Sequence, residues 1–318
     1  MSDGDVIIRA RGLTKRFGDF VAVDHVSLQV ARGSIFAFLG ANGSGKSTTI
    51  RMLIGILEPT EGQIEVDGID VIRHPRRVRD HIGYMGQKVS LYQGLTLREN
   101  VEFYAGLYGL SRAQLTERWG ALRERFSLAE AENEKPDDLP AGVRQRAGLA
   151  LSTLHHPRVL FLDEPTAGVD VHNRALFWDL IREEADAGVT VFVTTHFLEE
   201  ADYCDWISFI DAGRLVADAS PAELRRRFSN GYAVHVTLAQ PEREREPLLR
   251  AFAERKLAAA ASQDGVTVRT GDLDTATLDA LGAVLALVPG ARVRVEQPEM
   301  ADVFRAMMRE AAAAREAA

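Results

Sequence analysis

The chain has 318 residues, of which 46% are hydrophobic and 26% charged, a composition that indicates a folded globular protein and excludes a largely disordered one. Its net charge of −8 argues against general nucleic-acid binding, and its one cysteine, Cys204, excludes an internal disulfide. The sequence shows no signal-peptide core and no apolar run near the ~20 residues that span a bilayer, so we expect any membrane role to need a separate membrane partner.

Short apolar runs that predict strands alternate with helical patterns along much of the chain. Residues 34–40 form an apolar run that ends in Gly40, and a helical pattern follows at 47–57. Two further apolar runs, 158–165 and 189–196, suit strands that are buried on both faces. Strands of this kind separated by helices predict an α/β fold with a parallel-rich sheet, in which ligands bind at the carboxyl ends of the strands.

Two regions depart from this alternation. Residues 88–157 are helical in pattern throughout, which predicts a helical insertion into the α/β core. Beyond it, shorter strand and helix patterns predict a small α+β domain at 232–318, which leaves 1–231 as the main domain. The elements expected in the small domain are strands at 232–238, 265–271 and 291–297, and helices at 246–257, 275–287 and from 300 onward.

The stretch GANGSGKST at residues 40–48 fits the pattern G-x-x-x-x-G-K-[ST] of a phosphate-binding loop. Its glycines let backbone N–H groups turn inward around phosphate oxygens, and the N-terminus of the following helix adds a positive end. Lys46 would reach the β- and γ-phosphates, and Ser47 would ligate Mg²⁺. The alternative is a glycine-rich turn without a ligand. The residues expected at the nucleotide are Gly40, Asn42, Gly43, Ser44, Gly45, Lys46, Ser47 and Thr48.

Two acidic residues follow the apolar part of VLFLDEP, and a histidine ends the run VTTH. Asp163 is placed to hold Mg²⁺ through water, and Glu164 to polarise the water that attacks a nucleoside triphosphate. His196 would lie beside the γ-phosphate. Taken singly, the two acidic residues also suit the point where the chain leaves the core for solvent, and the histidine also suits a structural role.

Together these segments resemble the ATP-binding cassette (ABC) family over roughly residues 6–230, with GANGSGKST as the Walker A loop and VLFLDEP as Walker B. The resemblance implies a P-loop ATPase core with a β-rich N-terminal subdomain. GYMGQ resembles the Q-loop, so Gln87 would contact Mg²⁺ or the attacking water, and TTH resembles the H-switch, with His196 on the γ-phosphate. AGVD resembles the D-loop, with Asp170. RFGDFVAV resembles the A-loop, so Phe17 would stack on adenine, although by itself Phe17 suits a core position.

The family signature, usually Leu-Ser-Gly-Gly-Gln, is replaced here by LPAG at Leu139, Pro140, Ala141 and Gly142. In the family this loop caps ATP that is held by the Walker A loop of a partner cassette. Pro140 removes a hydroxyl and an N–H, but it is well tolerated in a first helical turn, so the loop could still present a positive helix end to phosphate. Either a homodimer or a heterodimer of cassettes is compatible with this change.

The resemblance implies the ATPase subunit of an ABC transporter, with ATP and Mg²⁺ as cofactors and a separate transmembrane permease as partner. The run from SLYQGL to GLYGL is similar to that of ABC-2-type exporters of drugs and antibiotics. We expect the chain at the cytoplasmic face of the membrane, held through its permease, with no nucleic-acid partner. The alternatives are a soluble ABC ATPase that acts on ribosomes or DNA, and a non-hydrolysing ATP-binding switch with a degenerate signature.

Overall fold

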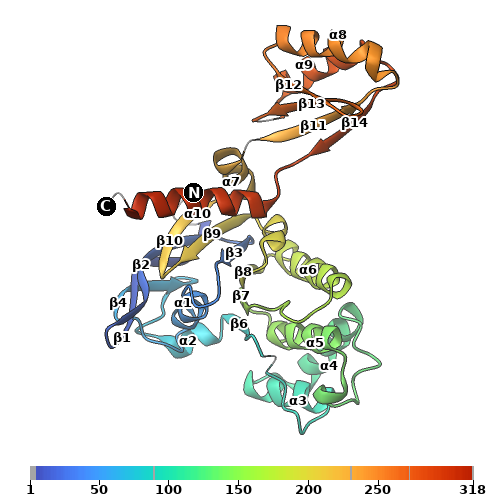
Figure 1. Cartoon of the computed structure of the whole chain (residues 1–318). Helices are drawn as coiled ribbons and strands as arrows, with labels where there is room; N and C mark the ends of the chain where they lie inside the picture. The colour runs from blue at the N-terminus through green and yellow to red at the C-terminus, as the bar shows by residue number, and fades with distance from the viewer. Residues whose placement is uncertain (1–4, 89, 230, 272, 317–318) are drawn as a thin grey trace. The chain divides into compact units, whose positions relative to one another are not determined.

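The computed structural model describes residues 5–88, 90–229, 231–271 and 273–316, and these form two compact units that divide between Ala219 and Ser220 (Figure 1). Helix α7 (Pro221–Phe228) belongs to the second unit, where it packs against α10 (Met300–Glu316). The domain boundary that we placed after residue 231 stays a prediction.

A four-stranded antiparallel sheet of order β2-β1-β4-β5 lies in the first unit. Its strands are β1 (Val6–Phe17), β2 (Phe20–Ala31), β4 (Glu61–Val66) and β5 (Ile69–Asp70). The two-residue turn between β1 and β2 places Gly18 at φ 58°, a left-handed conformation that glycine adopts without strain. Buried residues along β1 and β2 pack with helix α1 (Lys46–Leu53) and the neighbouring sheet into one hydrophobic core. This sheet is the β-rich N-terminal subdomain expected from the resemblance.

A six-stranded sheet of order β10-β9-β3-β8-β7-β6 forms the centre of the first unit (Figure 1). Its strands are β3 (Ile35–Leu39), β6 (Ile82–Met85), β7 (Val159–Asp163), β8 (Thr190–Thr195), β9 (Trp206–Asp211) and β10 (Arg214–Ala219). Neighbouring strands are parallel except for β10, which pairs antiparallel with β9 at one edge. Every residue of β3, β7 and β8 is buried, as their unbroken apolar runs predicted, and the predicted α/β fold class is confirmed.

Six helices lie in the described part of the first unit. They are α1 (Lys46–Leu53), α2 (Pro75–Arg79), α3 (Leu97–Leu107), α4 (Arg112–Arg125), α5 (Ala141–Thr153) and α6 (Val171–Asp186), with short 3-10 turns at Pro136–Asp138 and Leu198–Tyr203. Three of them, α3 to α5, lie in the chain segment that connects β6 to β7. Helices α3 and α4 each begin with a capping box, at Thr96 and Ser111. Each cap side chain accepts a hydrogen bond from a first-turn backbone N–H, which fixes where the two helices begin.

The second unit contains an antiparallel sheet of order β12-β13-β11-β14. Its elements besides α7 and α10 are β11 (Tyr232–Thr237), α8 (Pro241–Glu254), β12 (Ala258–Ser262), β13 (Gly265–Thr270), α9 (Thr275–Leu285) and β14 (Arg292–Glu296). Buried Val234, Phe252 and Val266 form part of a core of their own between the sheet and helices α8 and α9. Over the residues that the structure describes, none of the helices has the length and apolar character needed to cross a membrane.

Candidate nucleotide-binding site

The phosphate-binding loop predicted at residues 40–48 joins the carboxyl end of β3 to the first turn of α1. Gly43 and Gly45 have φ angles of 81° and 110°, which turn the chain tightly into the helix. Gly45 is the N-cap of α1 and supplies no side-chain hydrogen bond to the helix. Because the first N–H groups of a helix have no partner within it, this helix end is available to an anion.

Two glycines of the loop lie where no side chain fits. A Cβ on Gly40 would lie 2.3 Å from the carbonyl oxygen of Ile210, and one on Gly45 would lie 2.7 Å from that of Ala22. Gly43 has a positive φ as well, but a Cβ there would meet no atom within 4 Å. An alanine at Gly43 would therefore suffer backbone strain alone, whereas an alanine at Gly45 would suffer backbone strain and steric overlap.

Gly45→Ala is expected to lower the free energy of unfolding by about 3 kcal/mol, because a left-handed alanine must also move against the Ala22 backbone. Gly43→Ala, the matched control, carries only the conformational strain and should lose about 1 kcal/mol. Chemical denaturation of both variants measures the difference. Equal losses at the two positions would contradict the steric argument.

The carboxylate of Asp163 ends β7 and faces the start of α1. It accepts a hydrogen bond from Ser47 Oγ at 3.2 Å and a second from Thr194 Oγ1 at 2.6 Å. Asp163 is only 2% exposed, so these two hydroxyls fix the carboxylate in place. Strands β7 and β8 are parallel neighbours, which is why residues 31 positions apart meet at one edge of the sheet.

Glu164 adopts an unusual backbone conformation, with φ at 50°. Its N–H donates to both Oγ1 and the backbone oxygen of Thr194, at 3.0 Å each, and these bonds stabilise the turn. The side chain consequently points back toward the phosphate-binding loop, where its Oε1 lies 3.2 Å from Lys46 Nζ. Both side chains are buried, so this ion pair is held in a largely desolvated place.

The second carboxylate oxygen of Glu164 contacts two residues from other strand ends. Gln87 Nε2, beyond β6, donates to Oε2 at 3.2 Å, and His196 Nδ1, beyond β8, lies 3.3 Å from the same atom. Lys46 Nζ also donates to the backbone oxygens of Gly40 and Ala41, at 2.8 and 3.1 Å. The structure thus brings Lys46, Gln87, Glu164 and His196 together around one carboxylate.

The predicted signature lies at the start of α5. Leu139 is buried, Pro140 is the N-cap without a side-chain cap, and Ala141 is exposed. A Cβ on Gly142 would lie 2.7 Å from Cγ of Asn173, so glycine permits the close approach of α5 and α6. The predicted helix start is therefore present. Pro140 and Ala141 are exposed, and no residue of the first turn carries a side-chain oxygen.

The predicted D-loop residue Asp170 caps helix α6. Its Oδ2 accepts from Asn173 Nδ2 at 2.7 Å and its Oδ1 from Asn173 N at 3.1 Å. The Asn173 side chain, and then its backbone N–H, hold the pKa of Asp170 below its usual range. Asn173 also accepts from Arg146 Nη1 of α5 at 3.3 Å, so the signature helix and the D-loop are connected through one side chain.

Phe17 lies at the end of β1 and is 50% exposed, so it does not occupy the core position that is its alternative interpretation. Lys15 Nζ lies 5.3 Å from the centre of its ring. An exposed aromatic face at the end of a strand is free to stack on a planar ring. Stacking of Phe17 on adenine stays a prediction.

Sequence reasoning missed Thr194, which bonds to both acidic residues of the site. The available signal was the pair of threonines in VTTH, which directly follows the apolar residues VFV of the same strand. A buried hydroxyl needs a hydrogen-bond partner, and the neighbouring parallel strand supplies it at Asp163.

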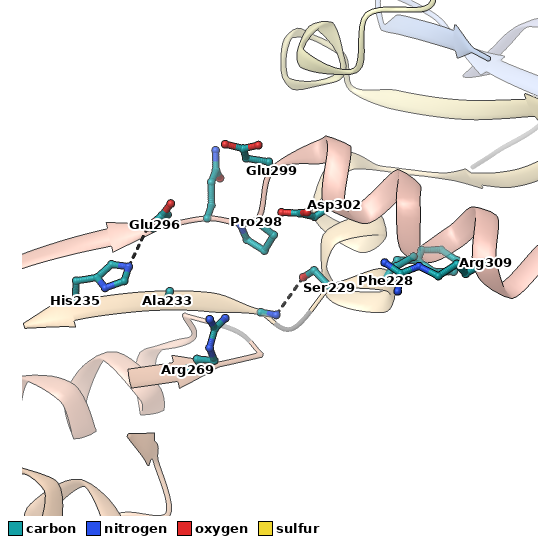
Figure 2. Close-up of a pocket in the computed structure, with 13 residues that line it drawn as sticks. Phe228, Ser229, Ala233, His235, Arg269, Glu296, Pro298, Glu299, Asp302 and Arg309 are labelled. Atoms are coloured by element: carbon teal, nitrogen blue, oxygen red, sulfur yellow. Dashed lines mark hydrogen bonds and ion pairs between the residues drawn. The ribbon is translucent and has the colours of Figure 1, made fainter. Parts of the chain in front are cut away.

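A separate cavity of about 750 Å³ lies in the second unit (Figure 2). His235 Nε2 on β11 lies 2.9 Å from Glu296 Oε2 on β14, and Arg269 on β13 lines the same cavity. Glu299 and Asp302, at the start of α10, line its other side. Basic and acidic side chains both line this cavity and none of them is fully buried, so its lining selects no class of ligand.

The comparisons with known proteins agree with the geometry of the first unit. A family model described as ABC transporter matches residues 23–167. A probable multidrug ABC transporter ATP-binding protein, YbhF, of Escherichia coli (strain K12) is 46% identical over 237 residues, which cover 74% of this chain and 41% of that protein. This chain therefore spans less than half the length of that relative.

Two further comparisons cover more of the matching protein. The daunorubicin resistance ATP-binding protein DrrA2 of Streptomyces coeruleorubidus is 35% identical over 303 residues, or 93% of each chain. A solved ATP-binding cassette, described as the dimeric structure of a post-hydrolysis state bound to ADP and Pi, is 25% identical with a TM-score of 0.62, and the match covers 67% of this chain and 98% of that one. The resemblance seen in the motifs is confirmed, and this chain belongs to the ABC transporter family.

Proposed function

We propose that this chain is the ATP-hydrolysing subunit of an ABC transporter, and that the transporter is an exporter of drug- or antibiotic-like compounds. The observation that carries the proposal is the convergence of Lys46, Gln87 and His196 on the Glu164 carboxylate, each within 3.3 Å. A cation, an amide and an imidazole around one carboxylate suit the hydrolysis of a phosphoanhydride. The names of the relatives, multidrug and daunorubicin resistance, support the exporter class.

The residues at the strand ends fit Mg²⁺ as well as ATP. The Ser47 hydroxyl, the Asp163 carboxylate and the Gln87 amide oxygen are hard oxygen donors of the kind that Mg²⁺ prefers. Ser47 and Asp163 already lie 3.2 Å apart, so a single ion could bind beside both. Mg²⁺, when bound, neutralises charge on the phosphate oxygens.

The chain's own side chains then have separate tasks in hydrolysis. Lys46 and the N-terminus of α1 bind the β- and γ-phosphates. Glu164 accepts a proton from the attacking water, whose oxygen forms a bond to the γ-phosphorus while the bond from that phosphorus to the ADP oxygen breaks. Gln87 and His196 orient the water and the γ-phosphate, since both lie at the carboxylate that takes the proton.

A dimer of cassettes completes the site in this proposal. The exposed start of α5 would face the phosphates held by a partner cassette, with helix N–H groups in place of the usual serine hydroxyl. One solved relative is described as dimeric, which supports this arrangement. Pairing of two copies and pairing with a different cassette both remain compatible with the surface of α5.

Pro140→Ser is expected to leave ATP turnover equal or higher and to stabilise the chain by about 1 kcal/mol. A serine at this N-cap restores a hydroxyl toward phosphate and can accept a hydrogen bond from the first turn of α5, which the proline cannot. Turnover and thermal denaturation of the same preparation measure both effects. A collapse of turnover would mean that proline is an integral part of a working variant loop.

The helical region offers a face for the membrane subunit. Tyr92, Phe103 and Leu107, on and before α3, expose 40% or more of their surface, and the rings of Tyr92 and Phe103 pack edge to face at 4.6 Å. Tyr84 and Tyr104 line a small cavity of about 20 Å³ in the same region, and Tyr84 lies three residues before Gln87. Clustered exposed aromatic residues mark interaction sites, so we assign this face to the permease, which would hold the chain at the cytoplasmic side of the membrane.

The proposed function is tested by ATP turnover of the purified chain as a function of its concentration, alone and with co-expressed permease. We expect turnover that rises more steeply than linearly with concentration, because each site needs a second cassette. ATP binding without turnover in every preparation would contradict the proposal and support a non-hydrolysing switch. Co-purification with ribosomes instead of a membrane protein would support a translational role.

A further inference from the structure

A line of three side chains connects helix α6 with the histidine of the site. The guanidinium carbon of Arg174 lies 4.1 Å from the centre of the Phe197 ring. The Phe197 ring in turn lies 4.2 Å from the ring of His196, centre to centre, at an angle of 36°. His196 then contacts Glu164. A cation over an aromatic face is attractive, so Arg174 holds the Phe197 ring against the imidazole.

A buried carboxylate anchors the far end of this line. Glu200 is fully buried, its Oε1 accepts from Thr166 Oγ1 at 2.5 Å, and the same oxygen lies 3.8 Å from Arg174 Nε. Among the residues that the structure describes, Glu200 Oε2 and Arg174 Nε have no hydrogen-bond partner. A buried carboxylate needs an opposite charge nearby, and Arg174 is the cation in contact with it.

The same contacts tie the predicted D-loop to the histidine. Arg174 lies one helical turn beyond Asp170, and its backbone N–H donates to the Asp170 oxygen at 2.9 Å. Thr166 lies in the short segment between Glu164 and Asp170. Glu200 N–H donates to the Phe197 oxygen at 3.2 Å. A shift of α6 would therefore move Arg174 on the Phe197 ring and so act on His196.

We propose that Arg174 and Phe197 are positioning residues that set the orientation of His196 and couple it to the D-loop helix α6. The role rests on the proposed ATPase function. Over the part of the chain that the structure describes, the His196 side chain, 33% exposed, makes one polar contact, with Glu164, and a single contact leaves its ring free to turn. The Phe197 ring supplies the missing restraint, and the Arg174–Glu200 contact keeps that ring in place.

The test begins with the kinetics of four single variants. Phe197→Leu removes the aromatic face but keeps an apolar side chain, and Arg174→Gln removes the cation. Each is expected to lower kcat about 10-fold, with KM for ATP changed less than about twofold, because the positioning acts on the chemical step. Phe197→Tyr keeps the ring and should retain near-normal kcat. Arg182→Gln, on the same helix, removes a surface contact with Asp205 at 3.4 Å and serves as the matched control.

The double variant Arg174→Gln/Phe197→Leu separates one shared mechanism from two independent effects. If both residues act through the same ring contact, the double variant should lose no more than about 10-fold in kcat. Losses that multiply to about 100-fold would overturn the coupling of the two residues. A defect in Phe197→Tyr as large as in Phe197→Leu would overturn the role of the aromatic face.

A spectroscopic arm does not depend on turnover, so failure of the proposed ATPase function remains distinguishable from failure of this proposal. The chain has eight histidines, and the ring proton signal of His196 is identified by its loss in His196→Gln. Because an adjacent aromatic ring shifts that signal, Phe197→Leu should displace it, and Arg174→Gln should displace it in the same direction. An unchanged His196 signal in Arg174→Gln would overturn the proposal even if the wild-type chain hydrolyses ATP normally.

Discussion

Glu164→Gln is expected to bind Mg-ATP with near wild-type affinity and to lower its turnover at least about 100-fold. Glutamine has nearly the same shape, so it can keep the contacts of the left-handed turn with Thr194. Its amide, however, cannot accept a proton from water. ATP should therefore accumulate on the protein, and dimers that depend on bound ATP should persist.

The measurement pairs ATP binding by calorimetry with phosphate release at saturating ATP. Glu199→Gln is the matched control, because Glu199 is an exposed carboxylate three residues beyond His196 and makes none of the site's contacts. It should retain normal turnover. Near-normal turnover in Glu164→Gln would refute the assignment of Glu164 as the base.

Lys46→Ala is expected to weaken ATP binding by about 100-fold or more. Hydrogen bonds to charged groups contribute about 1.5–3 kcal/mol each, and Lys46 would contact both the β- and γ-phosphates. The variant also leaves the buried Glu164 carboxylate without the cation 3.2 Å away, so a negative charge would face the phosphates unopposed.

Titration calorimetry with Mg-ATP measures the loss of affinity. Lys135→Ala removes the same charge from an exposed lysine and should leave ATP affinity unchanged. A thermal unfolding curve for each variant shows whether the fold is retained. Wild-type affinity in a folded Lys46→Ala protein would contradict the assignment of the loop to phosphate binding.

Local sequence predicted the secondary structure well where burial of apolar side chains alone determines it. The apolar runs that became β3, β7 and β8 are buried at every position, because a strand inside a sheet covered on both sides needs no polar face. The helix expected at 47–57 begins as predicted but ends at Leu53. Gly55, at φ 70°, stops it, since that left-handed conformation cannot continue a right-handed helix.

Strand β12 shows where local preference is overruled. Its sequence is four alanines and a serine, and alanine is the best helix former, so no strand was predicted there. In the structure these residues pair with β13, from Ala258 opposite Arg269 to Ser262 opposite Gly265. A short turn joins β12 to β13, and pairing with this neighbouring strand outweighs the small helical preference of each alanine.

Residue spacing alone decides the phosphate-binding loop, because its glycines, lysine and serine lie within nine consecutive positions and act through the backbone between one strand and one helix. The contacts of Glu164 are different. They depend on strand order, since β6, β7, β8 and β3 are parallel neighbours whose carboxyl ends bring Gln87, Glu164, His196 and Lys46 to one edge. The Arg174–Phe197–His196 line depends further on how α6 packs beside β8. Contacts between segments far apart in the chain arise only when the sheet assembles, because no short stretch carries the energy that selects its neighbours.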